Sequence, residues 1–351
     1  MIGAGTRDET AETSGACLAL KNTYLKTLRH TNETINYGMI QMSGGDMQMN
    51  YDQESIYFKG HCIEYDTIDM FQMMVDIALE PRSVIAANVA KSKNQKSHDL
   101  HKHLAKYDHN IEAQELLLRT AFGYNTLGMP HLGTHNNIAN IDARMIQQYI
   151  MDNITPKKCL IVASGVKNHL EYVELVKERL GELLAVPEHE YQRRASEYIG
   201  GEYRTWTESP STSIQLAFES VPWNHDDVMN FAVMQQLLGS AHVGSGSGRA
   251  FNAVRNNSFV DSVSSISSHF SDTGIFGIHV EGAGSHSADL LNVALDQLDS
   301  FRNPIDEAEL ARAKNKFLMD FYNHLEGSGD RLEEVARNYM SHGRLTLFET
   351  A

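Results

Sequence analysis

A glycine- and serine-rich stretch is the segment whose residue types come nearest to a binding loop. Residues 238–249 read LGSAHVGSGSGR. Loops of this kind bind phosphate when they follow a strand, as in G-x-x-x-x-G-K-[ST], or join a strand to a helix, as in G-x-G-x-x-G. Here the residues before the loop, 225–238, have the apolar spacing of a helix. The sequence therefore does not favour nucleotide binding, and a flexible connector between two helices is one interpretation that stays open.

Histidine and glutamate residues between positions 101 and 112 are the second group that could do chemistry. His109 and Glu112 are three residues apart and would share a helix face, and His101 and His103 lie close before them. No histidine follows Glu112 to complete a ligand set, and 17 histidines in one acidic chain make such spacings common. We interpret these residues as solvated helix positions rather than a metal site.

Composition narrows the classes of protein further. The chain has 351 residues, a length that favours two domains of roughly 150–200 residues each. Its 30 Lys and Arg against 45 Asp and Glu give a formal net charge of -15, which excludes a general nucleic-acid binder and permits a basic peptide as partner. The cysteines, Cys17, Cys62 and Cys159, are few and far apart, which argues against a disulfide framework and fits a reducing compartment.

Two segments of the chain share one pattern. Residues 55–81 and 274–304 each open with a short β-like run, continue through a polar break, and end in an amphipathic helix that stops near a proline. The apolar positions of the two helices follow spacings of three and four: Ile68, Phe71, Val75 and Leu79 in the first, Leu291, Ala294, Leu298 and Phe301 in the second. The offset of about 220 residues predicts a duplicated domain rather than a short repeat.

Strand and helix patterns occur in blocks, which predicts an α+β fold with a mostly antiparallel sheet covered by helices in each domain. Helices are predicted at 63–79, 84–105, 111–122, 142–152, 168–184, 225–238, 286–302 and 306–324, and strands at 53–60, 158–164, 213–219 and 273–281. The mixed-charge segment 188–199 is predicted to link a domain at 1–187 to a domain at 200–351. Aligning the two copies leaves about 25 residues missing before the first and about 60 after the second, so we expect truncation at both ends.

Four further stretches together resemble the pitrilysin (insulinase) family of inverted-zinc metallopeptidases. They are GAGTRDE at 3–9, TAFGYNTLGMP at 120–130, NIANIDARMIQQYIMDNITPKKCLIVASGV at 137–166 and HFSDTGIFGIHVEG at 269–282. Within the family they resemble the alpha subunits of the mitochondrial processing peptidase and the core subunits of respiratory complex III, with Asn125–Pro130 the piece most typical of the alpha type. The resemblance implies two metallopeptidase-like domains per chain and a place in the mitochondrial matrix or on the matrix face of the inner membrane.

The resemblance also places a zinc motif that this chain has lost. An active member carries H-x-x-E-H, in which two histidines hold Zn²⁺ and the glutamate acts as base. The matching positions here are Cys17, Leu20 and Lys21. An ammonium is a poor ligand and leucine cannot take a proton, and no glutamate lies between Glu80 and Glu112, where the family's further ligand would fall. We therefore expect no metal, no cofactor and no peptidase activity of the chain's own.

The glycine-rich stretch gains a second interpretation from the resemblance. Alpha subunits have a glycine-rich loop at this point that helps to bind presequences, which implies substrate-binding residues Gly244, Ser245, Gly246, Ser247 and Gly248. Bare backbone and small side chains let an extended peptide lie close. The implied partners are a beta-type processing-peptidase or core subunit, Arg-rich presequence peptides and other complex III subunits, with no nucleic acid.

Three functions stay open at this point. In the first, the chain is a non-catalytic alpha-type subunit that presents presequences to a zinc-bearing partner and serves in processing, as a core subunit of complex III, or in both. In the second it is a purely structural core protein of complex III without peptide handling, and in the third it is an active metallopeptidase with unrecognised ligands. The glycine-rich stretch favours the first over the second, and Leu20 and Lys21 argue against the third.

Overall fold

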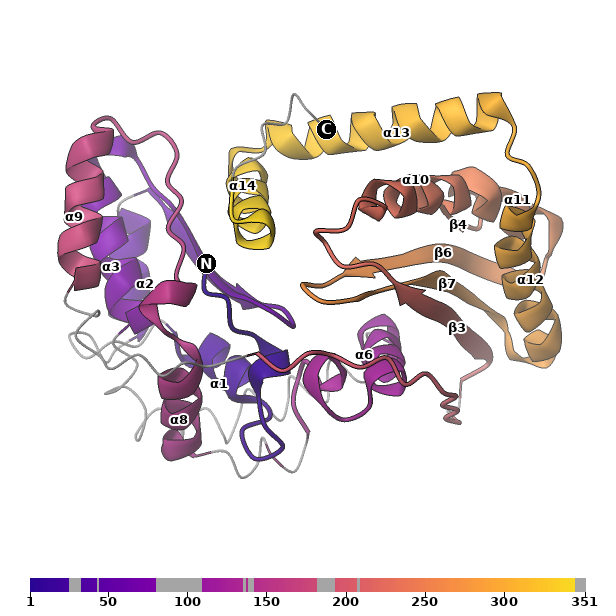
Figure 1. The fold of residues 1–351 in the computed structure, drawn as a ribbon, viewed down its shortest axis with the longest axis horizontal. Helices are drawn as coiled ribbons and strands as arrows, with labels where there is room; N and C mark the ends of the chain where they lie inside the picture. The colour runs from indigo at the N-terminus through magenta and orange to yellow at the C-terminus, as the bar shows by residue number, and fades with distance from the viewer. Residues whose placement is uncertain are drawn as a thin grey trace. The chain divides into compact units, whose positions relative to one another are not determined.

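The computed structural model of the chain (Figure 1) describes residues 1–24, 33–42, 44–79, 109–134, 137, 142–181, 193–206 and 209–344. The chain divides into two compact units: unit 1 is Met1–Ala195 with Val335–Met340, and unit 2 is Ser196–Glu334 with Ser341–Ala351. Both contain helices and antiparallel strands, as predicted for the fold class. The domain boundaries at 187 and 200 and the linker between them stay predictions, because residues 182–192 lie outside the described part.

Unit 1 contains an antiparallel hairpin and several helices. The hairpin is β1 (Asp46–Tyr51) and β2 (Ile56–His61). The helices are α1 (Ala16–Thr23), α2 (Glu33–Met42), α3 (Thr67–Leu79), α6 (His109–Phe122), α8 (Ala143–Asn153) and α9 (His169–Gly181), with 3-10 turns at Thr6–Asp8, Glu64–Asp66, Thr126–Gly128 and Pro156–Lys158. Alternation along β1 turns Met47, Met49 and Tyr51 inward, because successive strand side chains point to opposite faces.

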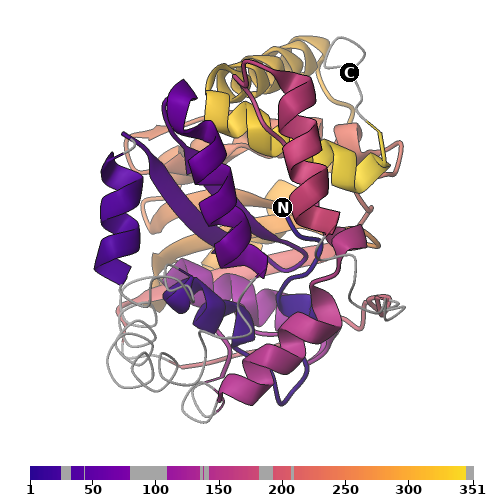
Figure 2. The ribbon, with the colours of Figure 1, turned by 90° about the vertical axis from the view of Figure 1, so that its left-hand side faces the viewer.

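Two apolar clusters hold the hairpin of unit 1 between helices. One joins β1 and β2 to α1 and α8, with Cys17, Ile56, Ile146 and Tyr149 fully enclosed. The other joins β1 to α2 and α3. Helices α3 and α9 lie side by side over the hairpin (Figure 2), and the rings of Phe71 and Tyr172 meet there with centroids 5.3 Å apart.

Unit 2 is a five-stranded antiparallel sheet with the order β3-β7-β6-β4-β5. The strands are β3 (Ser211–Ser220), β4 (Ser240–His242), β5 (Ser245–Gly246), β6 (Val260–His269) and β7 (Gly274–Ala283). The helices are α10 (Val228–Leu238), α11 (Gly248–Asn256), α12 (Ser287–Asp299) and α13 (Glu307–Glu326), with 3-10 turns at Gly284–His286 and Ser300–Arg302. Helix α14 (Ser328–His342) begins in unit 2, and its residues Val335–Met340 belong to unit 1. Side chains of α10, α11 and α12 pack with one face of the sheet to form the core of the unit.

The predicted repeat is visible in both units. In each, a strand leads through a three-residue 3-10 turn into a 13-residue helix: β2 into α3 in unit 1 and β7 into α12 in unit 2. The helices begin at residues 67 and 287, an offset of 220 residues. Each strand is also the second of an antiparallel pair, β1–β2 and β6–β7, so the duplication extends to the sheet.

Some predicted elements differ from those observed. Residues 158–164 form no strand; only Cys159 makes a bridge, to Ile2, which also bridges Ile56. The prediction of a strand at 158–164 is therefore wrong: the backbone hydrogen bonds to Met1 and Gly3 involve only Lys158 and Leu160, on either side of the bridge. The sequence missed β6, because its apolar residues Val260, Val263 and Ile266 are three positions apart and not two. The predicted helix at 84–105 lies outside the described residues. Among the described residues, no helix combines the length and apolar character needed to cross a membrane.

Two adjacent leucines of α12 test the core of unit 2. Leu290 is fully buried against the sheet, whereas Leu291 is 39% exposed. We expect Leu290→Ala to lower the free energy of unfolding by about 3 kcal/mol, because it removes buried methyl groups and leaves a cavity. Leu291→Ala should lower it by about 1 kcal/mol or less. Urea unfolding of the two variants measures the difference, and equal losses would show that α12 does not pack as described.

Candidate functional site

A buried glutamate holds the start of α1, the helix in which the resemblance places the zinc motif. The amide N–H of Gly15 donates to Oε2 of Glu9 and that of Cys17 to Oε1, both at 2.8 Å. The carboxyl group thus satisfies two of the free amides at the helix N-terminus. Burial raises the pKa of Glu9 to about 7, and the hydrogen bonds from Cys17 and Gly15 limit the rise. Sequence reasoning missed Glu9, because its partners follow six and eight residues later in a turn with no capping signature.

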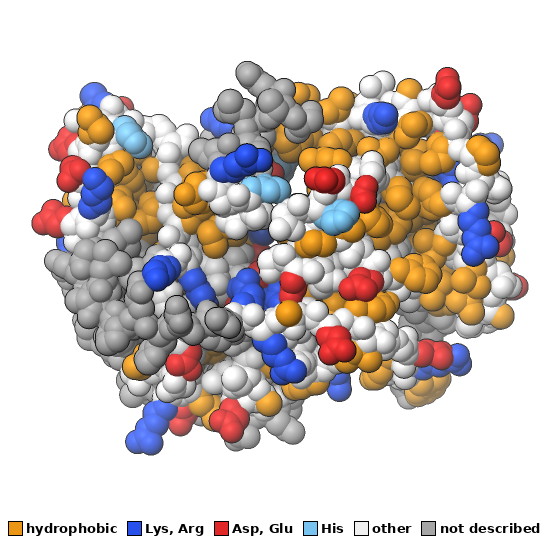
Figure 3. Space-filling model, in the orientation of Figure 1, with side chains coloured by type: hydrophobic (Ala, Val, Ile, Leu, Met, Phe, Trp, Pro, Cys, Tyr) orange, Lys and Arg blue, Asp and Glu red, His pale blue; other side chains and the backbone are white. Residues whose placement is uncertain are grey.

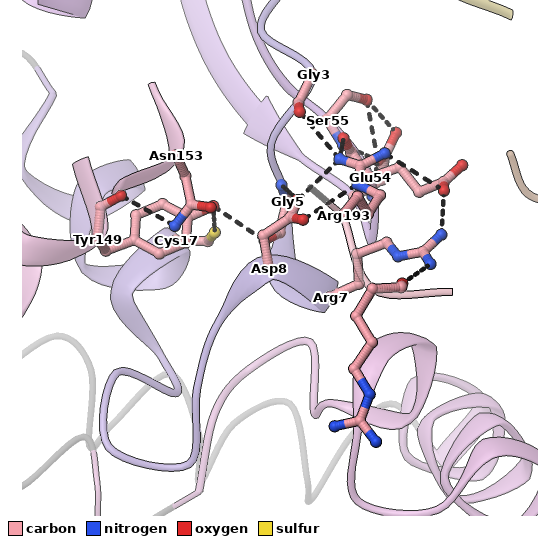
Figure 4. Close-up of polar contacts among 12 residues, drawn as sticks. Gly3, Gly5, Arg7, Asp8, Cys17, Glu54, Ser55, Tyr149, Asn153 and Arg193 are labelled. Atoms are coloured by element: carbon pink, nitrogen blue, oxygen red, sulfur yellow. Dashed lines mark hydrogen bonds and ion pairs between the residues drawn. The ribbon is translucent and has the colours of Figure 1, made fainter. Parts of the chain in front are cut away.

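Cys17 is enclosed in the core and does not face an open site. Its thiol donates to Oη of Tyr149 at 3.2 Å, and the Tyr149 hydroxyl donates to the carbonyl oxygen of Gly5 at 2.9 Å. Burial, and next the nearby carboxyl of Glu9, raise the pKa of Cys17 well above its ordinary value. The residue is a protonated thiol in a closed hydrogen-bonded chain, as Figure 4 shows.

Leu20 and Lys21 lie on either side of the same core. Leu20 packs against the apolar cluster of α1 and α8. Lys21 is exposed, and its ammonium donates to Oδ1 of Asn50 at 2.8 Å and lies 5.9 Å from the ring centre of Tyr51. The positive charge of Lys21 therefore stands on the outer side of α1, over a strand that carries a neutral amide and an aromatic ring.

The three positions do not fit a zinc ion. A zinc ligand must be a deprotonated sulfur, a neutral imidazole or a carboxylate. Here a thiol with a raised pKa, an aliphatic side chain and an ammonium ion replace the first ligand, the base and the second ligand. Among the side chains that the structure describes, no three from His, Cys, Asp or Glu come together as a metal site. The side chains of His109 and Glu112, and residues 101 and 103, lie outside the described residues, so their interpretation stays a prediction.

An aromatic pair that the sequence did not reveal lies beside this region. The rings of Tyr51 and His131 stack with centroids 4.5 Å apart, and the Tyr51 hydroxyl donates to the backbone oxygen of His131 at 3.1 Å. Burial lowers the pKa of His131, and the charge of Lys21 lowers it further against the opposing effect of Asp52. The imidazole is therefore neutral at neutral pH, and its buried Nδ1 has no hydrogen-bond partner among the residues that the structure describes.

A network of buried ions joins the start of unit 1 to residues 193–194 (Figure 4). Arg193 donates to both carboxylate oxygens of Asp8, at 2.8 and 3.1 Å, and to the backbone oxygens of Gly3 and Glu54 at 2.9 and 3.0 Å. Arg7 pairs with the carboxylate of Glu54 at 2.5 Å and donates to the backbone oxygen of residue 194 at 3.0 Å. These contacts position the N-terminal segment and the β1–β2 turn.

The glycine-rich stretch connects two helices, as one interpretation expected, and it does so through a short β-hairpin. Ala241 pairs with Gly246 and His242 with Ser245, and the N–H of Ser247 donates to the carbonyl oxygen of Ser240 at 2.9 Å. The chain enters the hairpin from α10 and leaves it into α11. The stretch is therefore the edge of the unit 2 sheet.

Two of the predicted binding glycines have a packing role of their own. A Cβ on Gly246 would come within 2.5 Å of the Cα of Ala241, and a Cβ on Gly248 within 2.7 Å of the carbonyl oxygens of Leu237 and Leu238. Gly248 also has a φ of +71°, which favours glycine. Gly246 and Gly248 are therefore needed for the hairpin to form, with or without a ligand.

The tip of the hairpin is the open part. Gly244 has a φ of +90° and no atom within 4 Å of the place a Cβ would take, and Ser245 beside it is exposed. Ser247 is half-buried at the base. Gly246 and Gly248 are exposed as well, so all three predicted glycines and Ser245 remain open to a peptide.

The buried Glu9 makes stability depend on pH. Its pKa of about 7 in the folded chain lies above the ordinary value of 4.5, so the unfolded state ionises first and stability falls as pH rises from 4.5 to 7. We expect wild type to lose roughly 2 to 3 kcal/mol more between pH 5 and pH 8 than Glu9→Gln, which stays neutral. Urea unfolding at both pH values measures this, with Glu178→Gln on the exposed face of α9 as control. Parallel pH profiles of wild type and Glu9→Gln would contradict the buried position of Glu9.

The chain is similar to a known protein family and to several known proteins. The family profile described as "Peptidase M16 inactive domain" matches residues 140–317. The chain is 25% identical to the probable mitochondrial-processing peptidase subunit beta of Arabidopsis thaliana, over 98% of this chain and 66% of that protein. It is 24% identical to the beta subunit of Neurospora crassa (98% and 74% covered) and 24% to the alpha subunit of Solanum tuberosum (97% and 69%). The chain thus spans about two thirds to three quarters of these relatives.

A solved structure has the same fold. A chain of "Complex III2 from Candida albicans, Inz-5 bound" superposes with a TM-score of 0.83 at 20% sequence identity, over 99% of this chain and 81% of that chain. The aligned part of the chain includes residues of both units.

Proposed function

The chain belongs to the M16 peptidase family, and we propose that within it the chain is a non-catalytic, alpha-type subunit of a mitochondrial processing peptidase. The expected resemblance to processing-peptidase subunits is confirmed at the level of the family. Relatives include beta and alpha subunits at similar identity, so the subunit type rests on the residues at the zinc position.

The observation that carries the proposal is the chemistry of α1. A buried protonated Cys17, an aliphatic Leu20 and an exposed Lys21 stand where an active member holds and uses its metal. Glu9 and Tyr149 fix the helix by hydrogen bonds instead. A chain built in this way needs a partner that supplies the zinc-bound water, and its own part is to pair with that partner and to present the peptide.

Surface properties support pairing and basic substrates. Exposed apolar side chains gather over α10 and α13 (Figure 3), among them Met229, Leu318, Met319 and Tyr322. Apolar surface of this kind is typical of a protein–protein interface. The net charge of -15 attracts Arg-rich presequences through long-range electrostatics. The proposed location is the mitochondrion, in the matrix or on the matrix face of the inner membrane.

A purely structural core protein of complex III is the second candidate. It is favoured by the packing role of Gly246 and Gly248, which accounts for these glycines without any peptide. Co-purification discriminates between the two, since a core protein brings cytochrome subunits with it and a processing subunit brings the zinc-bearing partner alone.

Metal content and peptidase activity test whether the zinc and the catalysis belong to the partner subunit. We expect the chain by itself to hold no stoichiometric zinc and to cleave no presequence peptide, because Cys17, Leu20 and Lys21 cannot bind the ion or act as base. Co-expressed with a zinc-bearing beta-type subunit, it should form a heterodimer with one zinc and full cleavage activity. One tightly held zinc in the isolated chain, lost on Cys17→Ala, would overturn the proposal and favour an active peptidase.

A charge placed at the hairpin tip tests peptide handling. Ser245→Lys adds a cation beside Gly244 without disturbing the hairpin, since Ser245 is exposed. In the heterodimer we expect KM for an Arg-rich presequence to rise several-fold, with kcat unchanged, because the reacting atoms lie on the partner. Ser258→Lys, at an exposed serine after α11, is the matched control. Equal KM values for the two variants would remove the tip from substrate binding and favour the structural candidate.

A further inference from the structure

The strand β1 has an outer edge with which no described strand pairs. Its other edge is hydrogen-bonded to β2, where Tyr51 lies opposite Ile56. The amide N–H of Asp52 donates to the carbonyl oxygen of Ser55 at 2.8 Å, so Asp52 is a hydrogen-bonded position of this antiparallel pair. Because hydrogen-bonded and non-hydrogen-bonded positions alternate, the backbone N–H and C=O groups of Met49 and Tyr51 point to the outer edge.

The side chain of Lys21 lies across this outer edge. Its helix, α1, packs with Met49 and Tyr51 on the inner face of the hairpin. Asn50, between these two residues, points to the opposite face. The ammonium of Lys21 nevertheless donates to Oδ1 of Asn50 at 2.8 Å. Since β2 occupies the other edge of the strand, the Lys21 side chain passes around the free edge of β1 to make this contact.

The positive charge of Lys21 has no counterion among the residues that the structure describes. Its contacts on β1 are an amide oxygen and an aromatic ring, which are both uncharged. Asp52, the next carboxylate along the chain, pairs with Arg337 at 3.1 Å. Burial lowers the pKa of His131, and Lys21 lowers it further against the opposing effect of Asp52, so this imidazole is neutral as well. The edge of β1 therefore has a local positive charge in a chain of net charge -15.

Helix stability alone does not account for the place of this charge. Lys21 is in the last turn of α1, where a cation interacts favourably with the helix dipole. That interaction requires no contact with the strand, because the helix end itself provides it. A lysine held against Asn50 loses side-chain freedom, which opposes the contact. The position of the ammonium at the strand edge points to a role toward molecules that approach this edge.

We propose that Lys21 is a specificity-determining residue that keeps arginine-rich peptides away from the edge of β1, an inference that rests on the proposed function. The acidic chain attracts basic peptides over its whole surface. A free strand edge can also bind an extended peptide by main-chain hydrogen bonds. Because α1 lacks the ligands and the base, a peptide held there is not cleaved. A repulsive group against the unproductive position leaves the peptide available to the catalytic partner.

The distances suit such repulsion. A peptide added to β1 would lie about 4.8 Å from the strand, on the side where the Lys21 ammonium stands. This separation is shorter than the screening length of about 10 Å at 0.1 M salt, so like charges still repel each other there. An uncharged or acidic peptide would meet no such barrier, and high salt should remove it.

Unproductive binding has a kinetic signature that distinguishes it from structural damage. A peptide held where no cleavage occurs lowers kcat and KM by the same factor. The ratio kcat/KM stays unchanged, because it compares the transition state with free enzyme and free peptide, and neither is altered. Damage to α1 or weaker pairing with the partner would instead lower kcat/KM.

The test uses the heterodimer of the chain with a zinc-bearing beta-type subunit. The substrates are an arginine-rich presequence peptide and a match in which the arginines outside the cleavage position are glutamine. Lys21→Gln removes the charge, Lys21→Glu reverses it, and Lys21→Arg keeps it. Lys177→Gln is the control, since Lys177 is an exposed lysine of unit 1 whose charge is paired with Glu174. Unfolding midpoints and pairing with the partner are measured for each variant.

For the arginine-rich peptide we expect Lys21→Gln to lower kcat and KM together by roughly threefold, and Lys21→Glu by roughly tenfold, with kcat/KM unchanged. Lys21→Arg and Lys177→Gln should match wild type. The effect should be smaller for the glutamine-substituted peptide and should disappear at 0.5 M salt, a concentration of roughly three times the physiological ionic strength. Unchanged constants in Lys21→Glu, or a fall in kcat/KM without a matched fall in KM, would overturn the proposal.

A failure of the proposed function is separate from a failure of this inference. If no active heterodimer forms, the proposed function is wrong. Binding of the fluorescent arginine-rich peptide to the full chain alone then decides the role of Lys21. Tighter binding by Lys21→Glu than by wild type and Lys177→Gln, lost at high salt, would support it, and equal affinities would overturn it.

Discussion

Three consecutive charged residues, Arg7, Asp8 and Glu9, are buried in unit 1, and each needs a partner that offsets the loss of water. Asp8 forms an ion pair with Arg193, and Arg7 forms one with Glu54. Glu9 accepts hydrogen bonds from the free amides at the start of α1. Removing one member would leave its partner charged and buried, which is more destabilising than never forming the pair. The N-terminal segment, the β1–β2 turn and α1 therefore have one mutual arrangement.

This arrangement holds α1 in place through contacts of the chain's own residues. In a zinc enzyme the bound ion itself holds the helix, the base and the ligands in one arrangement. Here Glu9 binds the helix amides, and the Cys17 thiol closes a chain through Tyr149 to the backbone at Gly5. The helix keeps its position while its outward residue, Lys21, carries a positive charge where the family's second ligand would stand. The loss of chemistry and the gain of internal hydrogen bonds fit a subunit whose remaining task is binding.

In unit 2, the residues that pack in the core differ from the residues that remain at the surface. The helices take the apolar face of the sheet, and the hairpin glycines Gly246 and Gly248 serve backbone contact. The hairpin tip, where Gly244 and Ser245 are exposed, takes no part in this packing. Gly246 and Gly248 have a packing role that holds whether or not they also contact a peptide.

The sequence by itself determined the class of fold, the duplication and the acidic character, because the periodicity of apolar residues and the net charge can be seen in the sequence without tertiary contacts. The resemblance to a family added the expectation that Cys17, Leu20 and Lys21 stand at the positions of a zinc motif, where their side-chain chemistry does not suit the ion. Only the tertiary structure decided that Arg193 pairs with Asp8 185 positions away, that Cys17 meets Tyr149, and that Ser213 meets His279 across two strands. Such pairs depend on strand register and on how distant segments pack. Strand register and the packing of distant segments have no short-range sequence pattern. A polar residue looks the same in a sequence whether it hydrogen-bonds to water or to a buried partner.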